Sequence, residues 1–83
     1  NAIETDLLLA YPNPAENRLN VEINTSDAGN ATLRLFDLQG RIVIENEVEL
    51  QEGSNQKVLN LENLTPGIYF LKWNNHVTRV VKM

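Results

Sequence analysis

Side chains that could perform acid–base or nucleophilic chemistry are few and scattered in this 83-residue chain. His76 is the only histidine, and a catalytic triad would require it beside Ser26 or Ser54 and an orienting carboxylate. Both serines lie in predicted loops. The chain has no cysteine, which excludes a thiol nucleophile, a disulfide and a thiolate metal site, and a lone histidine argues against zinc. We therefore expect no enzyme activity and no catalytic, cofactor or metal site.

Two groups of side chains could bind a partner rather than catalyse a reaction. Three glutamates alternate along residues 45–49, where they could hold a cation, contact a basic partner or simply form a solvated face that discourages strand pairing. Tyr69 and Trp73 share one face of another predicted strand, and with Tyr11 they could stack against a sugar. Because the face they share is apolar and contiguous, packing in the core is the favoured interpretation.

Composition narrows the possible partners. The formal net charge is -4 and the seven basic residues are spread from Arg18 to Lys82, so no basic patch suited to nucleic acid is present. No apolar run approaches the roughly 20 residues of a membrane-spanning helix. With 42% apolar and 22% charged residues, the chain is typical of a globular domain. We interpret it as a fragment or processed product, with residues 1–6 as a linker from an upstream domain and residues 7–83 as one domain.

The elements that must position these groups are strands. Apolar residues alternate with polar ones, and no stretch shows the spacing of an amphipathic helix. A continuous apolar run over residues 68–71 is typical of a central strand. About seven short strands separated by turn residues predict an all-β sandwich or small barrel. Their approximate ranges are 7–11, 18–24, 31–35, 42–50, 59–61, 68–71 and 77–83.

Turn residues predict two antiparallel hairpins, over residues 31–50 and 68–83. In the first, residues 37–40 suit a type I turn that ends on a glycine with positive φ. The resulting one-residue shift would place Leu35 opposite Ile42 and Leu33 opposite Ile44. In the second, residues 74–75 are two asparagines, which tolerate left-handed geometry in a tight turn. Residues 65–68, with proline then glycine, predict a type II turn before this hairpin.

Four segments, in order along the chain, resemble the C-terminal sorting domain of Bacteroidetes type IX secretion cargo. The first is Tyr-Pro-Asn-Pro-Ala at residues 11–15 with Leu-Asn-Val at 19–21. The second, residues 35–43, is similar to the family's Asp-x-x-Gly hairpin, and the third, residues 61–71, to its Gly-Ile-Tyr strand. The last is the short basic and apolar segment at residues 80–83.

The resemblance implies a seven-stranded immunoglobulin-like sandwich without catalytic activity, carried at the end of a larger exported protein. It implies that an outer-membrane translocon recognises the domain and directs the cargo to the outside or to the cell surface. A cell-surface sortase then often removes the domain, and we expect the cut at or before residues 1–6. The positions implied in translocon recognition are Pro12, Asn13, Pro14, Asp37, Gly40, Gly67, Tyr69 and Lys82.

Several of these positions also have a purely structural interpretation. The turns could require Gly40 and Gly67, the core could require Tyr69, and Lys82 could be an ordinary solubilising charge on an edge strand. We expect the Pro-Asn-Pro bend, the Gly40 hairpin and the last strand to form one rigid face, with a strand edge left unpaired. The alternatives are an immunoglobulin-like spacer, a carbohydrate-binding module of a surface enzyme, which would require exposed aromatics, and an adhesion or oligomerisation domain.

Overall fold

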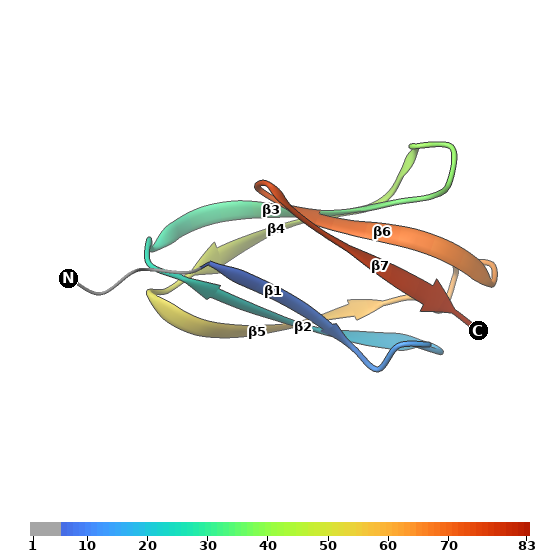
Figure 1. Cartoon of the computed structure of the whole chain (residues 1–83), viewed down its shortest axis with the longest axis horizontal. Helices are drawn as coiled ribbons and strands as arrows, with labels where there is room; N and C mark the ends of the chain where they lie inside the picture. Colours follow the sequence, from blue (N-terminus) through green and yellow to red (C-terminus); the bar gives the residue numbers. More distant parts are fainter. Residues whose placement is uncertain (1–5) are drawn as a thin grey trace.

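The computed structural model describes residues 6–83, which fold into seven strands in two facing sheets (Figure 1). The strands are β1 (Leu7–Tyr11), β2 (Arg18–Thr25), β3 (Gly29–Phe36), β4 (Ile42–Leu50), β5 (Gly53–Asn60), β6 (Gly67–Trp73) and β7 (His76–Lys82). One sheet has the order β1-β2-β5 and the other the order β4-β3-β6-β7, and all these pairs are antiparallel. The predicted all-β sandwich is confirmed. Residues 6–83 include no helix that is long and apolar enough to cross a membrane.

The strand order is close to that of an immunoglobulin domain. The constant-type arrangement places the fourth strand in the sheet of the first, second and fifth strands. Here β4 instead pairs with β3, because the short turn between them keeps the two strands in one hairpin. The second sheet therefore has four strands and the first has three. As predicted, β6 is a central strand, between β3 and β7.

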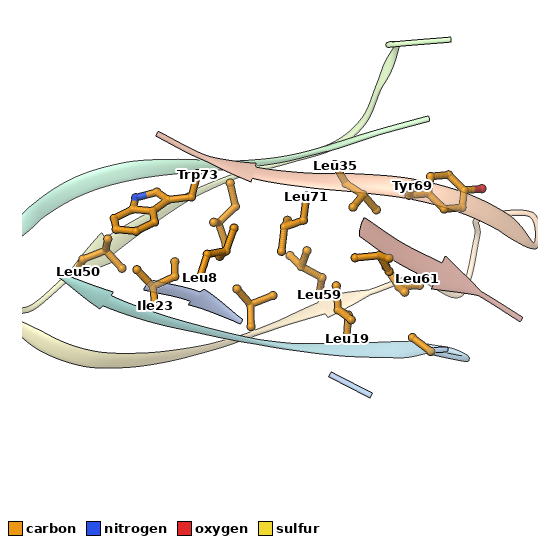
Figure 2. Packing of buried hydrophobic residues seen from close by; sticks show 14 residues of the cluster. Leu8, Leu19, Ile23, Leu35, Leu50, Leu59, Leu61, Tyr69, Leu71 and Trp73 are labelled. Atoms are coloured by element: carbon orange, nitrogen blue, oxygen red, sulfur yellow. The ribbon is translucent and has the colours of Figure 1, made fainter. Parts of the chain in front are cut away.

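The core lies between the two sheets and follows the period-two pattern of the strands. Leu19, Val21 and Ile23 of β2 are at most 1% exposed, whereas the intervening residues face outward. Figure 2 shows these inward side chains meeting those of the other sheet, with Trp73 and Tyr69 at opposite ends of the cluster. The alternation predicted from the sequence therefore selects the buried face correctly.

The β3–β4 hairpin forms where predicted, but its register differs from the predicted one. Leu35 pairs with Ile44 rather than with Ile42. Leu33 likewise pairs with Asn46 rather than with Ile44. The displacement is two residues along β4, so the inward faces of the two strands still match.

Two additional residues on the β4 side explain this displacement. The turn contains three residues, because the N–H of Asp37 donates to the carbonyl of Arg41 at 2.9 Å. A second shift follows beyond Phe36, which pairs with Ile42 and leaves Val43 as the extra residue of a bulge. As a result Ile42 faces outward and is 50% exposed.

The two remaining predicted turns have different outcomes. Asn74 and Asn75 form the predicted two-residue turn, with Asn74 at φ 54° between the paired ends of β6 and β7. The type II turn predicted at residues 65–68 is wrong. The turn instead closes earlier, where the N–H of Leu64 donates to the carbonyl of Leu61 at 3.0 Å, and Gly67 already begins β6 at φ 155°.

Candidate functional site

The eight positions singled out in the sequence gather at one end of the sandwich, the end at which the chain terminates (Figure 1). We call it the C-terminal end. Strand pairing accounts for the convergence: Gly67 at the start of β6 pairs with Lys82, and Lys82 also forms a parallel bridge with Ala15. The positions are Pro12, Asn13 and Pro14 after β1, Asp37 and Gly40 between β3 and β4, Gly67 and Tyr69 in β6, and Lys82 in β7.

The Pro-Asn-Pro segment is attached to β7 rather than projecting freely. The side-chain amide of Asn13 donates from Nδ2 to the carbonyl of Arg79 at 2.9 Å. Its Oδ1 accepts the N–H of Val81, also at 2.9 Å. Immediately afterwards, Ala15 donates its N–H to the carbonyl of Val81 at 2.7 Å and accepts the N–H of Met83 at 2.8 Å. These four bonds hold the segment against the outer edge of the last strand.

A carboxylate organises the β3–β4 turn. Oδ1 of Asp37 accepts the N–H groups of Gln39 and Arg41 at 2.9 Å each, and Oδ2 accepts Nε of Arg41 at 2.9 Å. The hydrogen bond from the Arg41 N–H is the largest cause of a lowered pKa at Asp37, partly opposed by desolvation and reinforced by the Arg41 guanidinium. Gly40 completes the turn at φ 84°, a left-handed conformation that suits glycine. The predicted positive φ is confirmed.

Tyr69 ties the segment before β6 to the core. Its ring is buried, with 6% of the residue exposed, and its hydroxyl donates to the carbonyl of Thr65 at 2.5 Å. This is the tyrosine corner of immunoglobulin-like sandwiches, in which a tyrosine near the start of the sixth strand bonds to the backbone a few residues upstream. The prediction that Tyr69 packs in the core is confirmed.

Lys82 is buried, which excludes the alternative of a solubilising charge on an exposed edge. Only 7% of the residue is exposed, and its side chain lies on the same face of β7 as the core residue Val80. Its Nζ reaches the carbonyl of Met83 at 3.0 Å. The aliphatic stem therefore covers the C-terminal end of the core while the ammonium group reaches the backbone at the rim.

Two shallow surface grooves flank these segments. One, of about 490 Å³, lies beside the Pro-Asn-Pro segment and is lined by Pro12, Pro14, Arg18 and Met83 among others. The other, of about 390 Å³, separates residues 37–43 from residues 63–69. Leu38, at the tip of the β3–β4 turn, lines the second groove and is 64% exposed. The C-terminal end thus presents apolar surface between rigidly held turns.

The remaining candidates from the sequence lie elsewhere and form no reactive site. His76 stacks on Trp73 at the opposite end of β7, with ring centroids 5.2 Å apart. Trp73 is 2% and Tyr69 is 6% exposed, so two of the three aromatic side chains of the sugar-stacking platform are buried, and Tyr11 alone of the three is exposed. Within residues 6–83, no group of three or more histidines and carboxylates could hold a metal ion.

The glutamates of β4 face solvent on an edge strand, as the solvated-face interpretation predicts. Glu45 forms an ion pair with Arg34 of β3, with Nε and Oε2 2.6 Å apart. Both side chains are close to half exposed, so the pair adds little stability.

Sequence reasoning missed two residues that hold the fold together. Ala15 is fully buried, and nothing in its residue type or spacing marks it apart from the prolines before it. Asn55 is 9% exposed, and its amide bonds both the N–H and the carbonyl of Gln51 across the β4–β5 turn, at 2.9 and 2.8 Å. A signal existed for Asn55, because it occupies an inward position of β5 in register with buried Leu59.

Comparisons with known proteins point to one family. Residues 9–83 match the family described as "Secretion system C-terminal sorting domain". The chain is also 38% identical over 47 residues to the thiol protease/hemagglutinin PrtT of Porphyromonas gingivalis, an alignment that covers 57% of this chain and 5% of that protein.

A solved structure supports the same fold. The crystal structure of dimeric latent PorU from Porphyromonas gingivalis superimposes on all of this chain and on 10% of that chain, with a TM-score of 0.80. At 13% identity this similarity concerns the fold alone. The chain therefore spans only a small part of either protein that it matches.

Proposed function

Since this chain belongs to the family of secretion-system C-terminal sorting domains, we propose that the C-terminal end of its sandwich is the surface that a type IX translocon recognises. The domain is a non-catalytic sorting signal of type IX secretion cargo, and such a domain implies secretion of the attached cargo across the outer membrane.

The observation that carries the proposal is the convergence of three motif segments, distant in sequence, on one end of the molecule (Figure 1). Each segment is held in place by a specific side chain: Asn13 bonds β7, Asp37 bonds the backbone of its own turn, and Tyr69 bonds the segment before β6. A surface held in this way costs little conformational entropy when a partner binds it. Rigid turns are therefore well suited to recognition.

Exposed and buried positions have different roles in this proposal. Pro12, Pro14 and Gly40 are exposed and are free to touch the translocon directly. Tyr69 and Lys82 are buried, so they would act by shaping the surface from below. Leu38 joins the contacting set because it is an exposed apolar side chain at the tip of the Gly40 turn.

A fusion-export assay tests the surface. We expect a reporter that carries Leu38→Arg to accumulate in the periplasm, because a charge would replace apolar contact surface at the C-terminal end. The matched control is Val77→Arg, which alters a similarly exposed apolar residue at the start of β7, near the opposite end. Deletion of residues 78–83 should block export as well. Normal export of the Leu38→Arg fusion, or of the deletion, would contradict the proposal.

We further propose that a cell-surface sortase removes the domain after export, leaving the cargo at the cell surface. The cut is expected at or before residues 1–6, and of these residues 1–5 lie outside the described part of the chain. Mass spectrometry of the mature cargo tests this step. Mature cargo that still carries Pro12-Asn13-Pro14 would count against removal of the domain.

A further inference from the structure

We propose that the side-chain carboxamide of Asn13 takes the place of a main-chain peptide group in a short fifth strand, which runs parallel to β7 along the outer edge of the four-stranded sheet. We propose further that Asn13 serves sorting by positioning β7 rather than by touching the translocon. The first half of this inference concerns the fold alone. The second half rests on the function proposed above.

The main chain begins the extra strand at Ala15. Ala15 lies opposite Lys82 in a parallel bridge, donates to the carbonyl of the preceding residue of β7, Val81, and accepts the N–H of the following one, Met83. A residue in a parallel ladder thus bonds both neighbours of the residue that it faces.

The side chain of Asn13 repeats this pattern two residues earlier along both strands. The corresponding position on β7 is Val80, whose neighbours are Arg79 and Val81. Nδ2 of Asn13 donates to the carbonyl of Arg79, and Oδ1 accepts the N–H of Val81, both at 2.9 Å. The carboxamide therefore makes the two hydrogen bonds that a main-chain unit would make in that place.

The flanking prolines fit this arrangement. The chain pairs with β2 in the first sheet as far as Tyr11 and with β7 in the second sheet from Ala15, so residues 12–14 carry it between the sheets. A chain that leaves one ladder for another would ordinarily expose unpaired N–H groups. Pro12 and Pro14 have none, and the side chain of Asn13 supplies the missing ladder contacts.

The consequence is that the outer edge of β7 is closed over its last residues. The carbonyl groups of Arg79 and Val81 and the N–H groups of Val81 and Met83 all bond the 13–15 segment. Within residues 6–83, the outward main-chain groups that make no hydrogen bond to this segment lie earlier in the strand, at Val77 and at the N–H of Arg79. The expected unpaired edge is therefore absent where the sorting motif ends, and a partner strand could pair there only by displacing Asn13.

We call the two hydrogen bonds from the Asn13 side chain to β7 the Asn13 clamp. Hydrogen exchange tests this clamp independently of secretion. The N–H of Val81 points away from β6, so in Asn13→Ala its only protecting acceptor is lost, and we expect exchange at this amide to accelerate about tenfold or more. Amides of the β3–β4 hairpin should be unchanged. Asn24→Ala is the control, because Asn24 is an exposed asparagine of β2 near the opposite end of the molecule, and its side chain makes no hydrogen bond within residues 6–83. Unchanged exchange at Val81 in Asn13→Ala would overturn the clamp.

Export of a reporter fusion then separates positioning from direct contact. We expect Asn13→Ala to reduce export and Asn24→Ala to leave it unchanged. A disulfide between the bridged positions, Ala15→Cys with Lys82→Cys, should restore export to Asn13→Ala, because it refastens the segment without the carboxamide. Lys82→Cys also removes a buried side chain that supports the proposed surface, so rescue is judged against the same disulfide with Asn13 intact and against Lys82→Cys alone, not against the wild type.

Each outcome of the export assay decides one claim. Restored export supports positioning. A second outcome is that the disulfide-linked Asn13→Ala fusion stays in the periplasm while the disulfide-linked fusion with Asn13 is exported. This result would show that Asn13 itself contacts the translocon. Normal export of untethered Asn13→Ala despite fast exchange at Val81 would show that sorting does not need the clamp. Neither of these last two results would contradict the proposal that the translocon recognises the C-terminal end, which the Leu38→Arg fusion tests separately.

Discussion

Short polar side chains replace main-chain hydrogen bonds at the places where the strands of this domain end. Asn13 completes the edge of β7, Asp37 closes the β3–β4 turn, and Asn55 spans the β4–β5 turn. Asparagine and aspartate suit this role because their oxygen lies one bond closer to the backbone than that of glutamine or glutamate. In residues 6–83, no buried side-chain nitrogen or oxygen lacks a hydrogen-bond partner.

Among these single residues, Asp37 should make the stability of the domain depend on pH through the charge of its carboxylate. Its pKa is lowered from the ordinary value of 3.8, chiefly by the N–H of Arg41, so the folded state binds its proton less tightly than the unfolded state. The carboxylate therefore contributes its full stabilisation above the unfolded pKa and loses it as the pH falls through the lower folded pKa. Denaturant unfolding of the wild type and Asp37→Asn, repeated from neutral to acidic pH, measures the difference. We expect the wild type's advantage to shrink below about pH 4. A difference that does not vary with pH would contradict this account.

At the scale of the strands, contacts at the strand ends fix the position of β6 and of the segment before it. β6 is held on one side by β3 and on the other by β7, and the segment that leads into it is held by the tyrosine corner. Glycine at position 67 allows the chain to enter the strand at φ 155° while Tyr69 turns inward. The apparent turn sequence at residues 65–68 is thus the entry to a central strand.

Tyr69→Phe tests the corner because it removes only the hydroxyl group. The ring should stay in the core, but the carbonyl of Thr65 would lose its donor. We expect a loss of about 0.5–1.5 kcal/mol in the free energy of unfolding, measured by urea denaturation. Tyr11→Phe is the matched control: Tyr11 is 40% exposed, and its hydroxyl makes no hydrogen bond within residues 6–83, so its loss should have almost no effect. Equal effects of the two substitutions would show that the corner contributes nothing.

The whole molecule is a small sandwich whose two sheets must be held together without disulfides. A chain of this size buries a limited fraction of its surface, so its stability is sensitive to single packing defects. Ala15 lies where the first segment passes from one sheet to the other and is part of the common core. Its methyl group is fully buried at this crossing.

Enlarging this side chain should therefore strain the closure of the sandwich. We expect Ala15→Leu to lower the free energy of unfolding by about 1–3 kcal/mol, because extra methylene groups must displace packed neighbours or the segment itself. Ala28→Leu, in the exposed loop between β2 and β3, should change it by less than about 0.5 kcal/mol. Urea denaturation of both variants provides the comparison. An Ala15→Leu protein as stable as the wild type would show that this end of the core is loosely packed.

The sequence alone was sufficient for many local features of this protein, although the type II turn predicted at residues 65–68 does not form. Period-two alternation identified the inward faces except at Ile42, which faces outward, and the central position of β6 followed from its apolar run. The tight turn at Asn74 and the positive φ of Gly40 followed from residue type, because these features depend on neighbours along the chain. The family resemblance rested on the same local motifs, and the match over residues 9–83 agrees with it.

Only the tertiary structure decided how distant segments meet. The bulge at Val43 reflects the pairing of whole strands, and the burial of Lys82 reflects the way the second sheet closes over the core. The bonds of Asn13 join residues separated by 66 and 68 positions, and no local pattern specifies such a partner. Backbone preferences and side-chain alternation act over a few residues, whereas edge closure depends on which strands packing brings together. For that reason the sequence could place Pro12-Asn13-Pro14 in a bend, but could not reveal that the bend completes the last strand.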